Sequence, residues 1–319
     1  MKNHPPALGR RELLQLGLGL GTGLMLPGLM LPGQLLAQNT PAGLLTKAIP
    51  SSGEHVPLIG IGTARRYDVA ATEEELAPLR EVIRNLPGTG GTMIDTAPSY
   101  GNAETVVGNL VAEAGNRDQL FLCTKVGSGR QSVAAGLAEI ERSFQRLRTD
   151  RIDLLQVHNL GGVEQMLPIL REMKQAGRIR YYGMTTSSDR QYDDFERILA
   201  STEMDFIQID YAIDNRGAEE RILPLALDRG VAVQTNLPFG RGRVFDAFGD
   251  QPIPDWAAEF GISSWAQFAL KYIVSHPAVT CAIPGTARPA YLVDNIGASM
   301  GRLPDAATRQ RMADLIDSA

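Results

Sequence analysis

The sequence of 319 residues contains only two cysteines, Cys123 and Cys281. Neither belongs to a CxxC pair or to a Cys/His spacing typical of a metal site, so we expect buried core thiols and no metal. Positive charge is also sparse: the net charge is -5, and no cluster of Lys and Arg stands out that could neutralise a run of phosphates. This argues against a nucleic-acid partner. The average apolar content excludes a disordered or fibrous chain, so we expect a globular protein that acts on small molecules.

Charge is absent from a long segment near the N-terminus. Arg10 and Arg11 precede a stretch that carries no charged residue from Leu13 until Lys47, and this stretch is rich in Leu but interrupted by several Gly and Pro. It resembles a twin-arginine export signal. The resemblance implies a signal segment over residues 1–37, cleavage after Ala37, and export of the folded protein to the periplasm or cell envelope. The twin-arginine export machinery would then be a partner of the chain.

The same apolar stretch is long enough to span a bilayer, so a permanent membrane anchor remains an alternative. Repeated Gly and Pro weaken a spanning helix and favour the export signal. If the segment is not cleaved, we expect it to be the only part of the chain that contacts a membrane.

After residue 43 the chain alternates between short apolar runs and segments with helical spacing. A short hairpin comes first, from two strands over 45–50 and 55–58. Spacings such as that of Leu76, Leu79 and Val82, or of Leu137, Ile140 and Phe144, predict amphipathic crossover helices. The eight apolar runs cover residues 58–62, 93–97, 120–126, 152–158, 179–185, 206–211, 231–237 and 279–284.

This order predicts the α/β class and, within it, a (β/α)8 TIM barrel preceded by a short N-terminal β-hairpin. We expect one barrel domain over residues 38–319. An open doubly wound sheet is the alternative, but no GxGxxG follows the first strand to support it. Gly60-Ile61-Gly62-Thr63 lacks the third glycine and the helix start.

Four polar residues follow or end three successive predicted strands. Asp95 and Tyr100 flank the end of the second strand, Lys125 ends the third, and His158 ends the fourth. Each has an ordinary explanation on its own: a solvated lysine, a core histidine, a tyrosine in a loop. Together they would meet at the mouth of a barrel, where active sites are built.

The run from Asp95 to Gly101, Asp-Thr-Ala-Pro-Ser-Tyr-Gly, followed by Glu104, resembles the signature of the aldo-keto reductases. The resemblance extends over nearly all of residues 44–300. It implies hydride transfer from a nicotinamide to a carbonyl carbon while Tyr100 donates a proton to the oxygen. A phenol is a poor acid near neutral pH, so we expect the Lys125 ammonium to lower the pKa of Tyr100, and Asp95 to hold that ammonium. A neutral His158 would orient and polarise the carbonyl.

The resemblance also implies residues at the nicotinamide end of the cofactor. Gln208 matches the residue that hydrogen-bonds the carboxamide, although a glutamine pointing into the barrel is the alternative. Thr185 and Thr186 stand where relatives have Ser-Asn, and Asn236 replaces a stacking aromatic residue, which puts stacking in doubt. The remaining expected contacts at this end are Gly62, Thr63, Pro238, Phe239 and Arg241.

At the other end, the segment from Ile283 to Pro289 leads from the eighth strand into a helix start, which favours an anion. Asp294 and Asn295 match the pair that contacts adenine in relatives. Gly285 stands where many relatives carry a Lys for the 2′-phosphate, and Arg288 could supply that charge instead of being a solvated cation. With Gly285, Thr286 and Arg288 as contacts, we expect NADP, with NAD possible.

These residues predict an NAD(P)(H)-dependent oxidoreductase that reduces an aldehyde or ketone, or oxidises the alcohol. The alternative from another class is a cofactor-binding regulatory or interaction subunit with little turnover. The presence of all four polar residues at the strand ends argues against that alternative. The absence of an aromatic residue at position 236, which is Asn236, argues mildly for it. The substrate itself is not named by the sequence: Asn159 and Leu160 replace the Trp that is common after the histidine in relatives.

Overall fold

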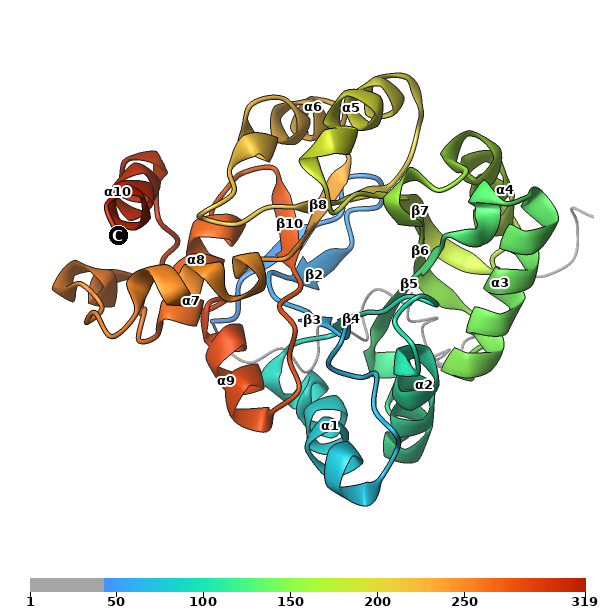
Figure 1. Cartoon of the computed structure of the whole chain (residues 1–319), viewed down its shortest axis with the longest axis horizontal. Coiled ribbons are helices and arrows are strands. Elements are labelled where there is room, and N and C mark those ends of the chain that lie inside the picture. Colours follow the sequence, from blue (N-terminus) through green and yellow to red (C-terminus); the bar gives the residue numbers. More distant parts are fainter. Residues whose placement is uncertain (1–42) are drawn as a thin grey trace, which may run out of the picture.

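The computed structural model of the chain describes residues 43–319, and the expected signal over residues 1–37 lies outside the described residues. Eight parallel strands form one sheet in the order β3 to β10, with helices around it (Figure 1). The strands are β1 (Thr46–Ala48), β2 (His55–Pro57), β3 (Ile61–Gly62), β4 (Met93–Asp95), β5 (Phe121–Val126), β6 (Ile152–Val157), β7 (Ile179–Thr185), β8 (Phe206–Asp210), β9 (Ala232–Asn236) and β10 (Val279–Ala282). The helices are α1 (Glu73–Asn85), α2 (Ala103–Ala114), α3 (Val133–Leu147), α4 (Val163–Gln175), α5 (Tyr192–Ser201), α6 (Ile222–Asp228), α7 (Arg243–Phe248), α8 (Trp265–Val274), α9 (Pro289–Gly297) and α10 (Ala306–Asp317).

The sheet closes into a barrel between its first and last strands. The N–H of Gly60 donates to the carbonyl of Ala282, and that of Gly62 to the carbonyl of Pro284, each at 2.9 Å. A Cβ at residue 62 would lie 2.8 Å from the carbonyl oxygen of Ile283, so the closing seam requires glycine there. The predicted (β/α)8 barrel is therefore confirmed, and an open sheet is excluded.

Local sequence explains where several crossover helices begin. Thr72 caps α1, its hydroxyl accepting from the N–H of Glu75 and donating to the Glu75 carboxylate. Ser264 caps α8 in the same way through the N–H of Gln267. The predicted helical stripe of α3 needs one correction: Leu137 is 41% exposed, because the helix turns Ile140 and Phe144 toward the sheet and leaves Leu137 at the edge of that face.

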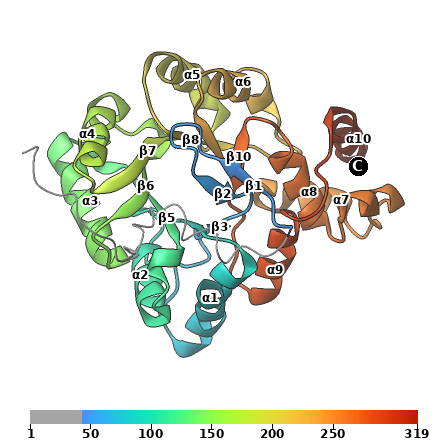
Figure 2. The ribbon, with the colours of Figure 1, turned by 180° about the vertical axis from the view of Figure 1, so that it is seen from behind.

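The predicted hairpin is present, and it lies across the end of the barrel at which the parallel strands begin (Figure 2). Ile49 and Val56 of the hairpin pack with the side chains that fill the barrel interior. The interior cluster includes Cys123 and Cys281, which are both fully buried, as the sequence predicts. The hairpin thus closes the amino end of the barrel and leaves the carboxyl end open for a ligand.

Residues 43–319 contain neither a membrane-spanning helix nor a cluster of metal ligands. No helix in this part of the chain has the length and apolar character needed to cross a membrane. No group of three His, Cys, Asp or Glu side chains is arranged there to hold a metal ion.

Candidate active site

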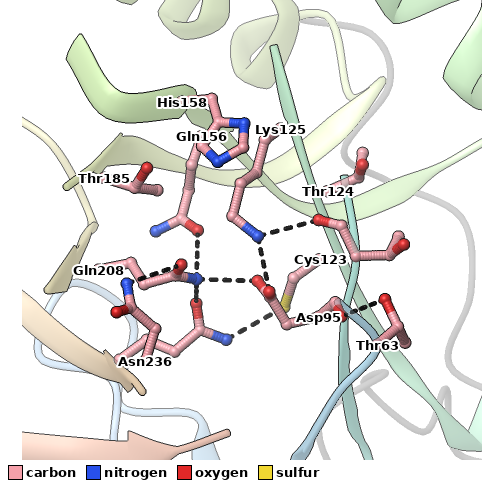
Figure 3. Close-up of polar contacts among 12 residues, drawn as sticks. Thr63, Asp95, Cys123, Thr124, Lys125, Gln156, His158, Thr185, Gln208 and Asn236 are labelled. Atoms are coloured by element: carbon pink, nitrogen blue, oxygen red, sulfur yellow. Dashed lines mark hydrogen bonds and ion pairs between the residues drawn. The ribbon is translucent and has the colours of Figure 1, made fainter. Parts of the chain in front are cut away.

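A pocket of about 760 Å³ opens at the carboxyl ends of the strands. Its volume lies in the range of small-molecule and cofactor sites. Parallel strands bring their carboxyl ends to one rim, so residues distant in sequence meet there (Figure 3). The predicted site residues that line the pocket are Gly62, Thr63, Asp95, Tyr100, His158, Thr185, Gln208, Asn236, Pro238, Phe239, Arg241 and Gly285.

Below the pocket, Lys125 and Asp95 form a buried ion pair. The Nζ of Lys125 lies 2.6 Å from Oδ2 of Asp95 and donates to the carbonyl of Thr96 at 2.9 Å (Figure 3). The other carboxylate oxygen accepts from Nε2 of Gln208 at 2.8 Å. Burial alone would lower the pKa of Lys125, but the Asp95 carboxylate outweighs this and raises it. The lysine therefore carries its charge beneath the pocket, held by the partner that the sequence predicts.

Tyr100 lies over this charge. The Nζ of Lys125 is 5.1 Å from the centre of its ring. Burial raises the pKa of the phenol above its ordinary value, while Lys125 acts in the opposite direction. Lys125 thus lowers the pKa of Tyr100 as the sequence predicts, but the net pKa lies above its ordinary value, because the desolvation of the phenolate exceeds the attraction of the ammonium. The phenol is protonated at neutral pH and available as an acid.

His158 lies beside Tyr100 in the pocket. Its ring meets that of Tyr100 edge-on, with centroids 5.9 Å apart, and its Nδ1 lies 3.4 Å from the hydroxyl of Ser99. Burial, followed by the nearby Lys125 and Arg130 charges, lowers the pKa of His158 to about 3. The imidazole is thus neutral at physiological pH, as the predicted role requires.

A network of buried amides connects the ion pair with the far wall of the pocket. The Nε2 of Gln208 also donates to Oε1 of Gln234 at 2.5 Å and lies 3.4 Å from Oε1 of Gln156 (Figure 3). Its Oε1 accepts from Nδ2 of Asn236 at 3.3 Å. In the free protein the amide of Gln208 is thus engaged with Asp95 and its neighbours.

Gln156 and Gln234 are parts of the site that reasoning from the sequence missed. Both are fully buried on barrel strands, and each stands two residues before a predicted site residue, His158 and Asn236 respectively. Strand side chains alternate between the two faces of a sheet, so a residue two positions before an inward-facing one also faces inward. A glutamine at such a position within an apolar strand is the signal that could have identified them.

The two threonines at the end of β7, Thr185 within the strand and Thr186 directly after it, are oriented differently. Thr185 lines the pocket, and its hydroxyl accepts from the N–H of Asn159 at 3.0 Å. Thr186 is fully buried, with its hydroxyl 2.7 Å from Oε1 of Gln191 and 3.0 Å from the carbonyl of Ser188. The side chain of Thr186 thus orders its own loop and does not line the pocket.

The residues predicted to contact the adenine end of the cofactor lie around the start of α9. Apart from Gly285, they lie outside the pocket. Arg288 precedes the helix and is exposed, its guanidinium 5.6 Å from the ring of Tyr291. The other predicted contacts have internal partners. Nδ2 of Asn295 donates to the hydroxyl of Thr286 at 3.1 Å, and the carboxylate of Asp294 accepts from Ser264 and Gln267 at 2.8 and 2.9 Å.

The comparisons with known proteins agree with this geometry. Residues 58–311 match the Aldo/keto reductase family. The chain belongs to that family. It is 34% identical over 208 residues to the aldo-keto reductase YhdN of Bacillus subtilis, a match that covers 60% of each chain. It is 29% identical over 256 residues to the methylglyoxal reductase YeaE of Escherichia coli, covering 78% of this chain and 88% of the relative.

Solved structures of aldo-keto reductases have a similar fold. An aldo/keto reductase of Klebsiella pneumoniae, solved in complex with NADP and acetate, superposes with a TM-score of 0.67 at 29% identity, covering 83% of this chain and 93% of the other. The holo form of the aldo-keto reductase AKR11C1 of Bacillus halodurans gives 0.69 at 25% identity, covering 86% and 97%. This aldo/keto reductase is accordingly an oxidoreductase.

Proposed function

We propose that this aldo/keto reductase reduces an aldehyde or ketone group of a small molecule, with NADPH as the hydride donor and Tyr100 as the proton donor. One arrangement carries the proposal: a phenol stands over the buried Lys125–Asp95 pair and beside a neutral imidazole. The reverse reaction, oxidation of the alcohol, would use the same groups. The fitting assay follows NADPH consumption with small aldehydes and ketones.

In this mechanism the protein acts on the carbonyl oxygen. The neutral His158 donates one N–H to that oxygen and orients it, and Tyr100 transfers its phenolic proton to it as negative charge develops. Lys125 stabilises the phenolate that remains, and Asp95 keeps the ammonium in place. When bound, NADPH supplies the hydride that reaches the carbonyl carbon.

The residues around the pocket fit a dinucleotide. Oδ1 of Asn236 is a buried acceptor without a hydrogen-bond partner among residues 43–319, and a carboxamide N–H would satisfy it. Arg241 is an exposed cation on the pocket rim, suited to a phosphate. We assign the nicotinamide end to Gly62, Thr63, Thr185, Gln208, Asn236, Pro238, Phe239 and Arg241, and the other end to Gly285, Thr286, Arg288, Asp294 and Asn295. Thr186 would contribute through its backbone, since its hydroxyl is already bonded.

Arg288 is expected to select NADPH over NADH, since its exposed guanidinium can pair bidentately with a 2′-phosphate. The Arg288→Ala variant should therefore lose about tenfold in affinity for NADPH, with little change for NADH, in a fluorescence titration of each cofactor. Arg142→Ala, on the exposed face of α3, is the matched control. Equal losses of affinity for both cofactors would show that Arg288 does not bind the 2′-phosphate.

We also propose that residues 1–37 direct export of the folded protein to the periplasm or cell envelope. This rests on the Arg10-Arg11 pair and the uncharged stretch after it. A cofactor bound before export would travel inside the folded barrel.

Replacing both Arg10 and Arg11 by Lys is expected to retain the protein in the cytoplasm, because the export machinery reads the guanidinium pair and not positive charge alone. Cell fractionation with immunoblotting measures this, and unchanged fractionation of the double variant would defeat the proposal. The N-terminal residue of the exported form decides between cleavage after Ala37 and an uncleaved anchor.

A further inference from the structure

Two adjacent arginines lie on the rim of the active-site pocket, and the mechanism above does not use them. Arg65 and Arg66 belong to the loop between β3 and α1, and both are exposed. Both line the pocket that contains Tyr100 and His158. Among residues 43–319, neither guanidinium forms an ion pair with a carboxylate. Two cations without an ion-pair partner in this part of the chain therefore line the same pocket as Tyr100 and His158.

The loop that carries the two arginines is anchored at two points to the segment between Asp95 and Asn102, which contains Tyr100. At its start, the N–H and the hydroxyl of Thr63 both donate to the carbonyl of Asp95, at 3.0 and 2.9 Å. Further along, the carboxylate of Asp68 accepts from the N–H of Asn102 at 2.9 Å. The arginines are thus held at a set position relative to Tyr100, which lies between these two anchors on the neighbouring loop.

The backbone at Arg65 has a conformation that side chains rarely adopt. Its φ is 60°, in the left-handed region, which costs free energy for any residue with a Cβ. Backbone of this kind is retained mainly where a ligand site requires it. Of the seven non-glycine residues with positive φ in the described chain, four line this pocket: Arg65, Asn159, Leu237 and Arg241.

The arginines that line the pocket outnumber its acidic groups. Asp95 is paired with Lys125, which leaves the carboxylate of Asp68 against Arg65, Arg66 and Arg241. Phe239 and Phe245, with ring centroids 4.9 Å apart, supply an apolar part of the wall. A cleft with an excess of positive charge attracts a ligand of negative charge.

We propose that Arg65 and Arg66 bind a carboxylate carried by the substrate, on the same molecule as the carbonyl that Tyr100 protonates. The guanidinium fork matches both oxygens of a carboxylate, and a second arginine adds to the positive charge. The substrate class is then an oxo acid, a carbonyl compound with a carboxylate at its other end. This inference rests on the proposed function, because it places the carbonyl at Tyr100 and His158.

The experiment compares aldehydes that differ only in charge: 4-carboxybenzaldehyde with its methyl ester, and succinic semialdehyde with its methyl ester. The wild-type protein is expected to show kcat/KM about tenfold higher for each acid than for its ester. Replacing Arg65 and Arg66 together by Ala should remove that preference and leave the esters within about twofold of wild type. Arg142→Ala, an exposed arginine on α3, should keep the preference. Added salt should weaken it, since both partners of the ion pair are accessible to solvent.

Three kinetic outcomes would overturn the inference. They are equal kcat/KM for acid and ester in the wild type, an unchanged preference in the double variant, or an equal loss for acid and ester accompanied by weaker NADPH binding. The last would mean that the arginines hold the cofactor. If the wild type reduces neither the acid nor the ester of either pair, the proposed function fails. Calorimetric binding of the two acids then tests the arginines alone. Binding that the double variant loses supports the carboxylate site, and binding that it retains overturns it.

Discussion

Replacing Tyr100 by Phe is expected to lower kcat for carbonyl reduction by about 10² to 10⁴, the usual contribution of a positioned general acid. Phe keeps the ring that stands over Lys125 and against His158 and removes only the proton that is transferred. Cofactor affinity and thermal stability should stay close to wild type. Steady-state turnover, with a fluorescence titration of NADPH and a melting curve, measures all three quantities.

Tyr67→Phe is the matched control for this experiment. Tyr67 lies on the neighbouring loop and is fully buried, and its hydroxyl has no hydrogen-bond partner among residues 43–319. Removing that hydroxyl should leave turnover unchanged. If Tyr100→Phe keeps near-normal turnover, another acid protonates the carbonyl oxygen. If the wild type binds NADPH but reduces no carbonyl compound, the protein serves as a cofactor-binding subunit.

The second large effect concerns Lys125. Lys125→Met removes the charge that opposes the effect of burial on the pKa of Tyr100, so the phenol becomes a weaker acid and turnover should fall. The loss should not add to that of Tyr100→Phe in the double variant, because both changes act on one proton transfer.

Lys125→Met should also destabilise the fold by about 3–5 kcal/mol, since it leaves the Asp95 carboxylate buried and unpaired. The pKa of Asp95 is already raised by burial, and without the ammonium it rises further. A buried carboxyl with a raised pKa binds its proton more tightly in the folded state, so stability falls as pH rises. The variant should therefore be less destabilised at about pH 5 than at about pH 8 in urea unfolding.

A charge-neutral double variant separates the two effects of Lys125. Lys125→Met with Asp95→Asn removes both buried charges and should regain much of the lost stability without regaining turnover. Recovery of turnover along with stability would show that the pair only supports the fold. Equal stability of Lys125→Met at both pH values would show that Asp95 is not left as an unpaired carboxylate.

The order of strands and helices could be predicted from the chain because the periodicity of apolar residues is local. Eight apolar runs, separated by helical spacings, correspond to the eight barrel strands from β3 to β10. The strand ends that carry Asp95, Lys125 and His158 could be predicted for the same reason. A parallel barrel brings its carboxyl strand ends to one rim whatever the details of packing.

What could not be predicted depends on partners that lie far away in the sequence. The Nε2 of Gln208 meets Asp95, 113 residues earlier, and this contact exists only because the barrel is closed. The pKa of Tyr100 is raised because burial outweighs the charge of Lys125, and burial is a property of the packed molecule. Arg65 and Arg66 look like ordinary solvated charges in the chain. Their place on the pocket rim follows from the anchoring of their loop to Asp95 and Asn102, since only folding brings these segments together.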